Sequence, residues 1–328
     1  MKKKAAMIVI AAAAFVLLLA VLLWLTSDRS DTVGICFRDS TGKENTTYRQ
    51  QLEQALTERG FEVITVDADL DQAKQLQQIA ELAQKKCDIL LIEPVMESAA
   101  EELLTVIANT ELPAVLFDRH IDTSLLKDYP QIAYVGMDET QPGFLQAQMM
   151  EALPAGGDLN GDGIVSYYMI RGQQDYLDAV IRAESFEKAL IDSDLVVQQL
   201  ACDSGDWTQE SGRKLCRQQL AALGKDIEVI VCGNDQMALG AAQAIADGGR
   251  TVGKDIYLLA IGGAGDTLNM ILEGRISGTV YPDPKVRMVA IAETVLAMFR
   301  EQPTESVTIL PYTTVTAENN KQFVENEM

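Results

Sequence analysis

The chain has 328 residues, enough for two α/β domains of ordinary size, and a formal net charge of −21 with a single histidine. So acidic a surface argues against nucleic acid as a partner. One histidine, and five cysteines without Cys-x-x-Cys spacing, argue against zinc or iron centres.

The amino terminus has the features of a membrane anchor. Lys2 to Lys4 precede a run from Ala5 to Leu25 that has no charge and no proline. At a rise of about 1.5 Å per residue, such a helix crosses a bilayer core. The positive-inside rule then leaves the amino terminus in the cytoplasm and places everything after Thr26 outside, so that residues 1–31 form a cytoplasmic tip, an anchor and a short tether. A cleaved secretory signal, giving a secreted protein, is the alternative, although the run lacks a small-x-small cleavage pattern.

The rest of the chain alternates short apolar runs with helix-length amphipathic segments, which predicts parallel sheets covered by helices on both faces. The pattern occurs twice, so we expect two α/β lobes. The first series is Val33–Phe37, Tyr48–Arg59, Phe61–Val66, Asp71–Lys86, Ile89–Ile92, Glu97–Asn109 and Ala114–Phe117. The second is Ile164–Ile170, Tyr176–Ile191, Val196–Ala201, Trp207–Leu223, Glu228–Val231, Asp235–Ala246, Tyr257–Ile261 and Gly265–Glu273.

Ligands of open parallel sheets bind at the carboxyl ends of the strands. Two lobes that face each other by those ends would hold a ligand between them. The candidate binding residues are therefore those that follow the predicted strands: Arg38, Asp39, Asp118, Arg119, Gln173 to Asp178, Asn234, Asp235, Gly262, Gly263, Pro282 and Asp283.

One loop carries oxygen side chains at every second position, a spacing typical of the first half of a calcium-binding loop. Its candidate ligands are Asp158, Asn160, Asp162, the carbonyl of Ile164 and Ser166. The twelfth position, where a complete loop has glutamate, is Met169, so a further carboxylate must come from elsewhere in the fold. The alternative is an Asx-rich turn without metal.

Seven motifs taken together resemble the periplasmic galactose/glucose-binding proteins, over most of Val33 to Glu327. They are Tyr134-Val135-Gly136, the loop Asp158 to Gly163, Asp178-x-x-x-Arg182, Trp207, Ile227 to Ile230, Asn234-Asp235-x-Met237-Ala238-x-Gly240 and Gly278-Thr279-Val280. The resemblance implies a type 1 periplasmic binding protein, α/β, with two Rossmann-like lobes of parallel sheet joined by a three-crossover hinge and, here, preceded by one transmembrane helix. The lobes would be residues 32–136 plus 286–310 and residues 137–285 plus 311–328. The hinge would lie at Val135–Asp138, Pro282–Pro284 and near Pro311.

The resemblance also implies site residues. Glu228 would complete a structural calcium site, with Ser166 standing where the family tends to have a longer glutamine. Trp207 would stack on the sugar, while Asp178, Arg182 and Asn234 would bind its hydroxyls. Asp118 and Tyr176 stand where the family has asparagine and histidine, and Gly262 and Pro282 replace two further contacts, so the sugar itself is not specified. Tyr48 is a candidate for a second ring.

Simpler interpretations exist for several of these residues. Trp207 can be a core aromatic at a helix start, and Asp178 with Arg182 can form a surface ion pair one helical turn apart. The turn Gly262 to Gly265 has backbone N–H groups that would suit an anionic group such as a sugar acid or phosphate, and a plain loose turn is the competing interpretation.

The expected function is that of an extracytoplasmic monosaccharide receptor in an ABC-type uptake system, closing on its ligand by hinge motion, and not an enzyme. Its partner would be a membrane permease. A membrane-anchored sensor that acts through a histidine kinase is the first alternative. A regulator-type core without its DNA-binding domain is the second, and the apolar amino terminus argues against it.

Overall fold

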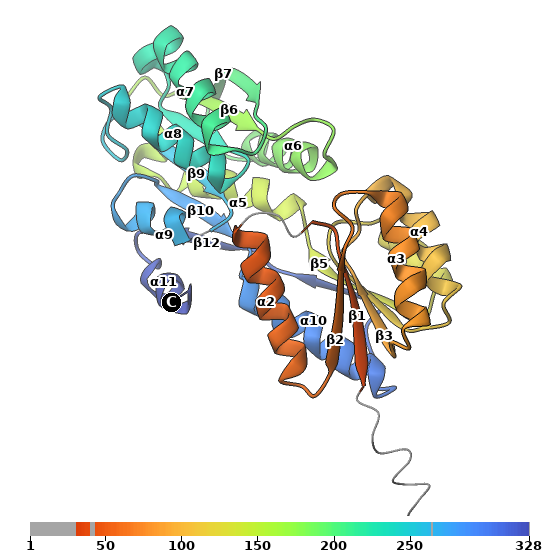
Figure 1. Ribbon diagram of the computed structural model, residues 1–328. Helices are drawn as coiled ribbons and strands as arrows, with labels where there is room; N and C mark the ends of the chain where they lie inside the picture. The colour runs from red at the N-terminus through yellow and green to blue at the C-terminus, as the bar shows by residue number, and fades with distance from the viewer. Residues whose placement is uncertain (1–30, 40–42, 264, 328) are drawn as a thin grey trace, which may run out of the picture.

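The computed structural model describes residues 31–39, 43–263 and 265–327, which form two lobes side by side (Figure 1). The predicted anchor Ala5–Leu25 lies outside these residues. Within the described ranges, no helix combines the length and the apolar character needed to span a membrane.

The first lobe is built on a six-stranded sheet in the order β2-β1-β3-β4-β5-β11, with every neighbouring pair parallel. The strands are β1 Thr32–Phe37, β2 Glu62–Asp67, β3 Ile89–Ile92, β4 Ala114–Asp118, β5 Ile132–Met137 and β11 Val307–Leu310. The helices are α2 Lys43–Thr57, α3 Gln72–Gln84, α4 Ala100–Ala108 and α10 Pro284–Phe299, with short 3-10 helices at Glu97–Ala99 and Thr123–Asp128.

The second lobe has a sheet in the order β7-β6-β8-β9-β10-β12. Its strands are β6 Val165–Arg171, β7 Val197–Ser204, β8 Val229–Cys232, β9 Tyr257–Ile261, β10 Gly278–Tyr281 and β12 Thr313–Thr316. Its helices are α5 Thr140–Glu151, α6 Leu177–Ile191, α7 Gln209–Leu223, α8 Asp235–Asp247, α9 Gly265–Leu272 and α11 Lys321–Glu327, with 3-10 helices at Pro154–Gly157 and Gly224–Asp226.

Each sheet lies between two layers of helices, as the continuous apolar strands predict. In the first lobe, α3 and α4 pack on one face and α2 and α10 on the other. In the second lobe, α7 and α8 cover one face and α5 and α6 the opposite one. All residues of β1, β3, β8 and β9 are buried, so the four apolar clusters meet on the two sheets and hold the strand ends rigidly.

The chain passes between the sheets three times: from β5 to α5, from β10 to α10 and from β11 to β12. The last crossover explains the one antiparallel pair among the described strands, β12 with β10. The carboxyl ends of both sheets point toward the other lobe. A strand that continues directly from one sheet into the other through Pro311 and Tyr312 must therefore run against its new neighbours.

Close helix packing in the second lobe generates a prediction. A Cβ on Gly240 of α8 would lie 2.0 Å from the Gln209 carbonyl oxygen of α7. Gly240→Ala should therefore lower the free energy of unfolding by about 1–3 kcal/mol, as overpacking does, although alanine is the better helix former. Urea unfolding measures this.

The matched control is Gly248→Ala, at the end of the same helix, where the nearest atoms lie 3.3 Å or more away. Gly240→Ala being as stable as the wild type, or more stable, would contradict the packing argument.

Candidate ligand site between the two lobes

An ion triad joins the two lobes where the carboxyl ends of their strands meet. Arg119 follows β4 in the first lobe, and its Nη1 lies 2.8 Å from Asp178 Oδ2 at the start of α6 in the second. Its Nη2 lies 2.6 Å from Glu97 Oε1 in its own lobe. We call Glu97, Arg119 and Asp178 the interlobe triad. Arg119 thereby ties a predicted ligand residue, Asp178, to the opposite lobe.

The triad places two carboxyl groups around one guanidinium. Burial, and next the nearby charge of Asp178, raise the pKa of the Glu97 carboxyl to about 7, while Arg119 acts in the opposite direction. Glu97 is therefore partly protonated near neutral pH. A proton that is easily lost here makes the contact between the lobes sensitive to pH.

A second ion pair connects α6 to the hinge. Arg182 Nε donates to Glu139 Oε2 at 2.8 Å, and the Tyr312 hydroxyl donates to Glu139 Oε1 at 2.8 Å. Glu139 lies on the first crossover and Tyr312 on the third. Asp178 and Arg182 thus have separate, largely buried partners, which excludes the surface pair along one helix. The Tyr312–Glu139 hydrogen bond joins two crossovers, and Arg182 ties them to α6.

A third group of interacting side chains lies entirely in the first lobe. Arg287 Nε of α10 lies 3.1 Å from Asp118 Oδ1, and the Arg287 guanidinium lies 4.6 Å from the centre of the Tyr48 ring. Burial raises the Asp118 pKa, and Arg287 opposes this effect. The backbone of Asp118 has φ +62°, in the left-handed region that residues other than glycine seldom adopt. Strained residues of this kind cluster at functional sites. Tyr48 does reach this region.

Next to Asp118 and Arg287, the side chains of Arg38 and Glu93 form a further ion pair. Arg38 Nε lies 3.7 Å from Glu93 Oε1, and the Arg38 backbone N–H donates to Glu93 Oε2 at 3.1 Å. Burial raises the pKa of Glu93 to about 7, and the charge of Asp118 adds to the rise. Glu93 and Glu97 both follow β3, so two carboxyl groups with a pKa of about 7 lie near the end of this strand.

The second lobe supplies an aromatic pair. Trp207 and Tyr176 pack edge to face, with ring centres 6.0 Å apart. The Trp207 ring lies so close over Gly172 that a Cβ there would be 2.0 Å from a ring carbon. Trp207 is partly buried against the core but has φ +70°, so it is a strained residue rather than an ordinary core aromatic.

Asn234 supports this aromatic pair. Its Oδ1 accepts from the Met237 N–H and so caps α8, and its Nδ2 donates to the Trp207 carbonyl at 3.0 Å. The amide thus fixes the backbone of Trp207 in its unusual conformation. In this structure Asn234 positions a predicted stacking residue, and a direct ligand contact through it remains a prediction.

The glycine turn after β9 does not suit an anion. A Cβ on Gly262 would lie 2.7 Å from Asp235 Cγ, and the Gly263 N–H points at Asp235 Oδ2, 3.3 Å away. The Asp235 carboxylate therefore fills the space that an anionic ligand group would need. At Gly262 and Gly263 the structure therefore contradicts an anion cradle, because the Gly263 amide faces the protein's own negative charge.

The predicted calcium loop is a tight turn held by its own side chains. Both Asp158 oxygens accept from backbone amides, those of Gly161 and Gly163, at 2.7 and 2.9 Å. Asn160 and Asp162 each accept from the amide two residues later. Glycines at positions 161 and 163, with φ +78° and +84°, allow this curl.

Glu228 does reach the loop. Its Oε1 accepts from the Leu159 and Asn160 amides at 2.7 and 3.0 Å, and its Oε2 accepts from Ser166 N–H at 2.8 Å. Oxygen donors of this type suit calcium, and each retains a free lone pair. However, no group of three or more acidic, histidine or cysteine side chains within the described residues is arranged to hold a metal ion. Glu228 acts here as an acceptor that fixes the loop to β8.

The structure brings together most predicted ligand residues and several that were missed. Asp118, Asp178 and Arg182 lie in the ion groups, whereas Tyr176, Trp207 and Asn234 form the aromatic side of the second lobe. The missed residues are Glu93, Glu97, Tyr134, Glu139, Arg287 and Tyr312. Glu93 directly follows a predicted strand and could have been found by the same rule. Arg287 and Tyr312 enter from α10 and a crossover, which only the fold reveals.

The raised pKa values of Glu93 and Glu97 predict the pH dependence of stability. The folded state holds protons that the unfolded state releases above pH 4.5, so stability should fall as pH rises from about 4.5 through about 7. The double variant Glu93→Gln/Glu97→Gln should flatten this fall in melting temperature. Glu293→Gln, at a carboxylate 58% exposed, is the control and should leave it unchanged. A wild-type melting temperature that is level over this range would contradict the assignment.

Comparison with known proteins agrees with this geometry. The family model described as "Periplasmic binding protein domain" matches residues 36–302. The D-galactose/methyl-galactoside binding periplasmic protein MglB of Haemophilus influenzae is 28% identical over 229 residues, 68% of each chain. The ribose import binding protein RbsB of Bacillus subtilis is 26% identical over 255 residues, 78% of this chain and 77% of that one.

Among solved structures, an ABC transporter solute binding protein of Bacillus halodurans with bound myo-inositol superposes with a TM-score of 0.75. It is 22% identical, and the match covers 91% of this chain and 99% of the other. These relatives are solute-binding proteins rather than enzymes, and their family is an extracytoplasmic one. The chain therefore belongs to the periplasmic binding protein domain family.

Proposed function

We propose that the protein is an extracytoplasmic receptor for a monosaccharide or a related cyclic polyol, which it encloses between its lobes and presents to an ABC-type permease. The observation that carries this is the interlobe triad: Arg119 of one lobe holds Asp178 of the other at 2.8 Å, among further polar groups at the strand ends. A sugar or cyclitol ring binds charged, planar side chains through the hydroxyls on its edge and an aromatic side chain through its apolar C–H face.

The connections between the lobes support a hinge motion. The three crossovers are short, and Glu139 and Tyr312, which lie on two of them, are bonded to each other and, through Glu139, to Arg182 of α6. Opening would separate Arg119 from Asp178 and admit the ligand, and closure would bury it. MglB is named as a galactose-binding protein and RbsB as a ribose import binding protein, and both names support a sugar as the ligand.

A membrane-anchored form is part of the proposal. The basic start and the uncharged run Ala5–Leu25 favour a tether to the cytoplasmic membrane. Such a tether suits delivery to a permease in the same membrane and equally a sensor beside a histidine kinase, the second candidate. Separation of membrane and soluble fractions, followed by immunoblotting, would distinguish the two: a tether gives a full-length chain in the membrane fraction, and a cleaved signal gives a shorter chain in the soluble fraction.

Tryptophan fluorescence tests ligand binding directly. The chain has two tryptophans, so Trp24→Phe leaves Trp207 as the sole reporter, at the aromatic side of the site. Titration with galactose, ribose or myo-inositol should change its emission. In the same background Asp178→Ala should weaken binding at least tenfold, the effect of losing a charged hydrogen-bond partner worth about 1.5–3 kcal/mol.

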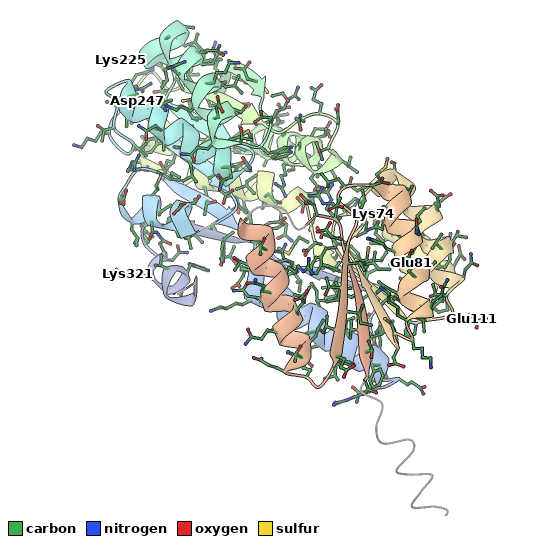
Figure 2. All side chains as sticks on the ribbon, viewed as in Figure 1. Lys74, Glu81, Glu111, Lys225, Asp247 and Lys321 are labelled. Carbon is green, nitrogen blue, oxygen red and sulfur yellow. The ribbon has the colours of Figure 1, made fainter. Side chains whose placement is uncertain are left out.

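The matched control is Asp247→Ala, an exposed carboxylate at the far end of the second lobe that also pairs with an arginine (Figure 2). It should bind as the wild type does. Equal affinity in the Asp178 variant would place the ligand elsewhere.

We also propose a structural calcium ion at the loop Asp158 to Ser166, closed by Glu228. Bound there, calcium would neutralise the carboxylates of Asp158, Asp162 and Glu228 and crosslink the loop to β8. The loop's oxygen spacing and the position of Glu228 against its backbone support this. It would stabilise the second lobe without touching the ligand.

The variant Asp162→Asn separates the effect of calcium binding from that of the loop's own hydrogen bonds. Asparagine keeps an oxygen for the Ile164 amide, which lies 2.8 Å away, but removes a charge. The variant should lose most of the calcium-induced rise in melting temperature and match the wild type in chelator. Glu228→Gln should instead be less stable in both, because three backbone amides depend on that carboxylate. A wild type that does not respond to calcium would leave the loop as a plain Asx turn.

A further inference from the structure

The interlobe site carries more negative than positive charge. Three of its arginines, Arg38, Arg182 and Arg287, each pair with one carboxylate, whereas Arg119 must serve both Glu97 and Asp178. When Glu97 is ionised, the triad is therefore one positive charge short, in a place where its side chains are at most 18% exposed.

A buried tyrosine hydroxyl lies within this negative region. Tyr134 of β5 is 0% exposed, and its hydroxyl has no hydrogen-bond partner among the described residues. It folds along its own strand over Gly136, where a Cβ would be 1.9 Å from the hydroxyl oxygen. Burial, and then Asp118, Glu139, Asp178 and Glu97 in turn, raise the Tyr134 pKa. The Tyr134 hydroxyl therefore lies in a negative electrostatic potential that these carboxylates create.

Asp178 has a carboxylate oxygen that depends on the Glu97 proton. The residue is 8% exposed, its Oδ2 is held by Arg119, and its Oδ1 has no partner in the described residues except the Glu97 carboxyl when that group is protonated. When Glu97 loses its proton, this buried oxygen needs another donor, which a ligand can supply. Across the site, Asp235 occupies the glycine turn, so an anionic ligand group is disfavoured there too.

We propose that the ligand carries a protonated amine, as an amino sugar or aminocyclitol does, and that this ammonium binds at Asp178 and Glu97 next to the Tyr134 hydroxyl. The inference rests on the proposed polyol receptor and narrows its ligand class. An ammonium has three donors for carboxylate and hydroxyl oxygens and supplies the missing positive charge. A neutral hydroxyl supplies a donor but no charge, so the triad stays balanced only while Glu97 keeps its proton.

Binding of such a ligand is coupled to a proton. Glu97 faces Asp178 of α6, Arg119 after β4 and Glu139 on the crossover, and its pKa near 7 means that it holds a proton at pH 6. An incoming ammonium replaces that proton, so binding releases close to one proton at pH 6 and tightens as pH rises toward 7. A neutral polyol does not bring a charge to displace it.

Isothermal titration of the full chain tests the proposal with matched pairs: galactose and galactosamine, glucose and glucosamine, myo-inositol and its monoamine. We expect at least one amine to bind tenfold or more tightly than its parent. Titrations at pH 6 in two buffers of different ionisation enthalpy should show release of nearly one proton. Glu97→Gln keeps the shape but removes the surplus charge, and should abolish both the preference and the proton release.

The outcomes separate this inference from the proposed function. If a neutral member binds as tightly as its amine, the protein is a polyol receptor and the amine proposal is overturned. An amine preference that survives Glu97→Gln would also overturn it, because the selectivity would then arise outside the triad. Binding of none of the six compounds would contradict the receptor function and the amine together.

Discussion

The structure depends on the fact that the parallel strands of both sheets end at the same interface. Loops at the carboxyl ends of β4, β6, β8 and β9 all open toward the other lobe, so polar residues that are far apart in sequence converge there. Helix layers on both faces of each sheet keep these ends rigid. The same constraint makes β12 antiparallel, because a strand that crosses the interface directly must enter the second sheet from its ligand side.

The ion pairs at this interface fall into two kinds, those within the hinge region and one that joins opposite lobes. Buried ion pairs recover little net free energy, since desolvation offsets most of the attraction, but breaking one by removing a partner costs about 3–5 kcal/mol. Arg182, Glu139 and Tyr312 stay on the hinge side, where they tie two crossovers to α6. Arg119 and Asp178 join opposite lobes, so the proposed hinge opening would separate this pair and leave the pairs near the crossovers in place.

Local pattern was sufficient for most of the fold. Ile89–Ile92 and Tyr257–Ile261 match the predicted strands residue for residue, because both are fully buried apolar runs between clear helices. The predicted hinge positions coincide with the passages between the sheets. Helix α2 begins at Lys43, five residues before its predicted start at Tyr48, because the polar first turn has no apolar periodicity. The anchor stays a prediction.

For the site, two sequence signals were informative. Strand ends indicated Asp118, Arg119 and Asp178, and the family resemblance indicated Asp178, Arg182 and Trp207, all of which lie near the interface. Their partners were decided by tertiary structure: Arg287 comes from a helix that returns to the first lobe, and Tyr312 from a crossover. That Asp178 binds Arg119 rather than Arg182 one turn along the same helix also depends on how two separately folded lobes meet. The sequence determined which residues reach the interface from each sheet, and only the packing of the lobes decided which charges face each other.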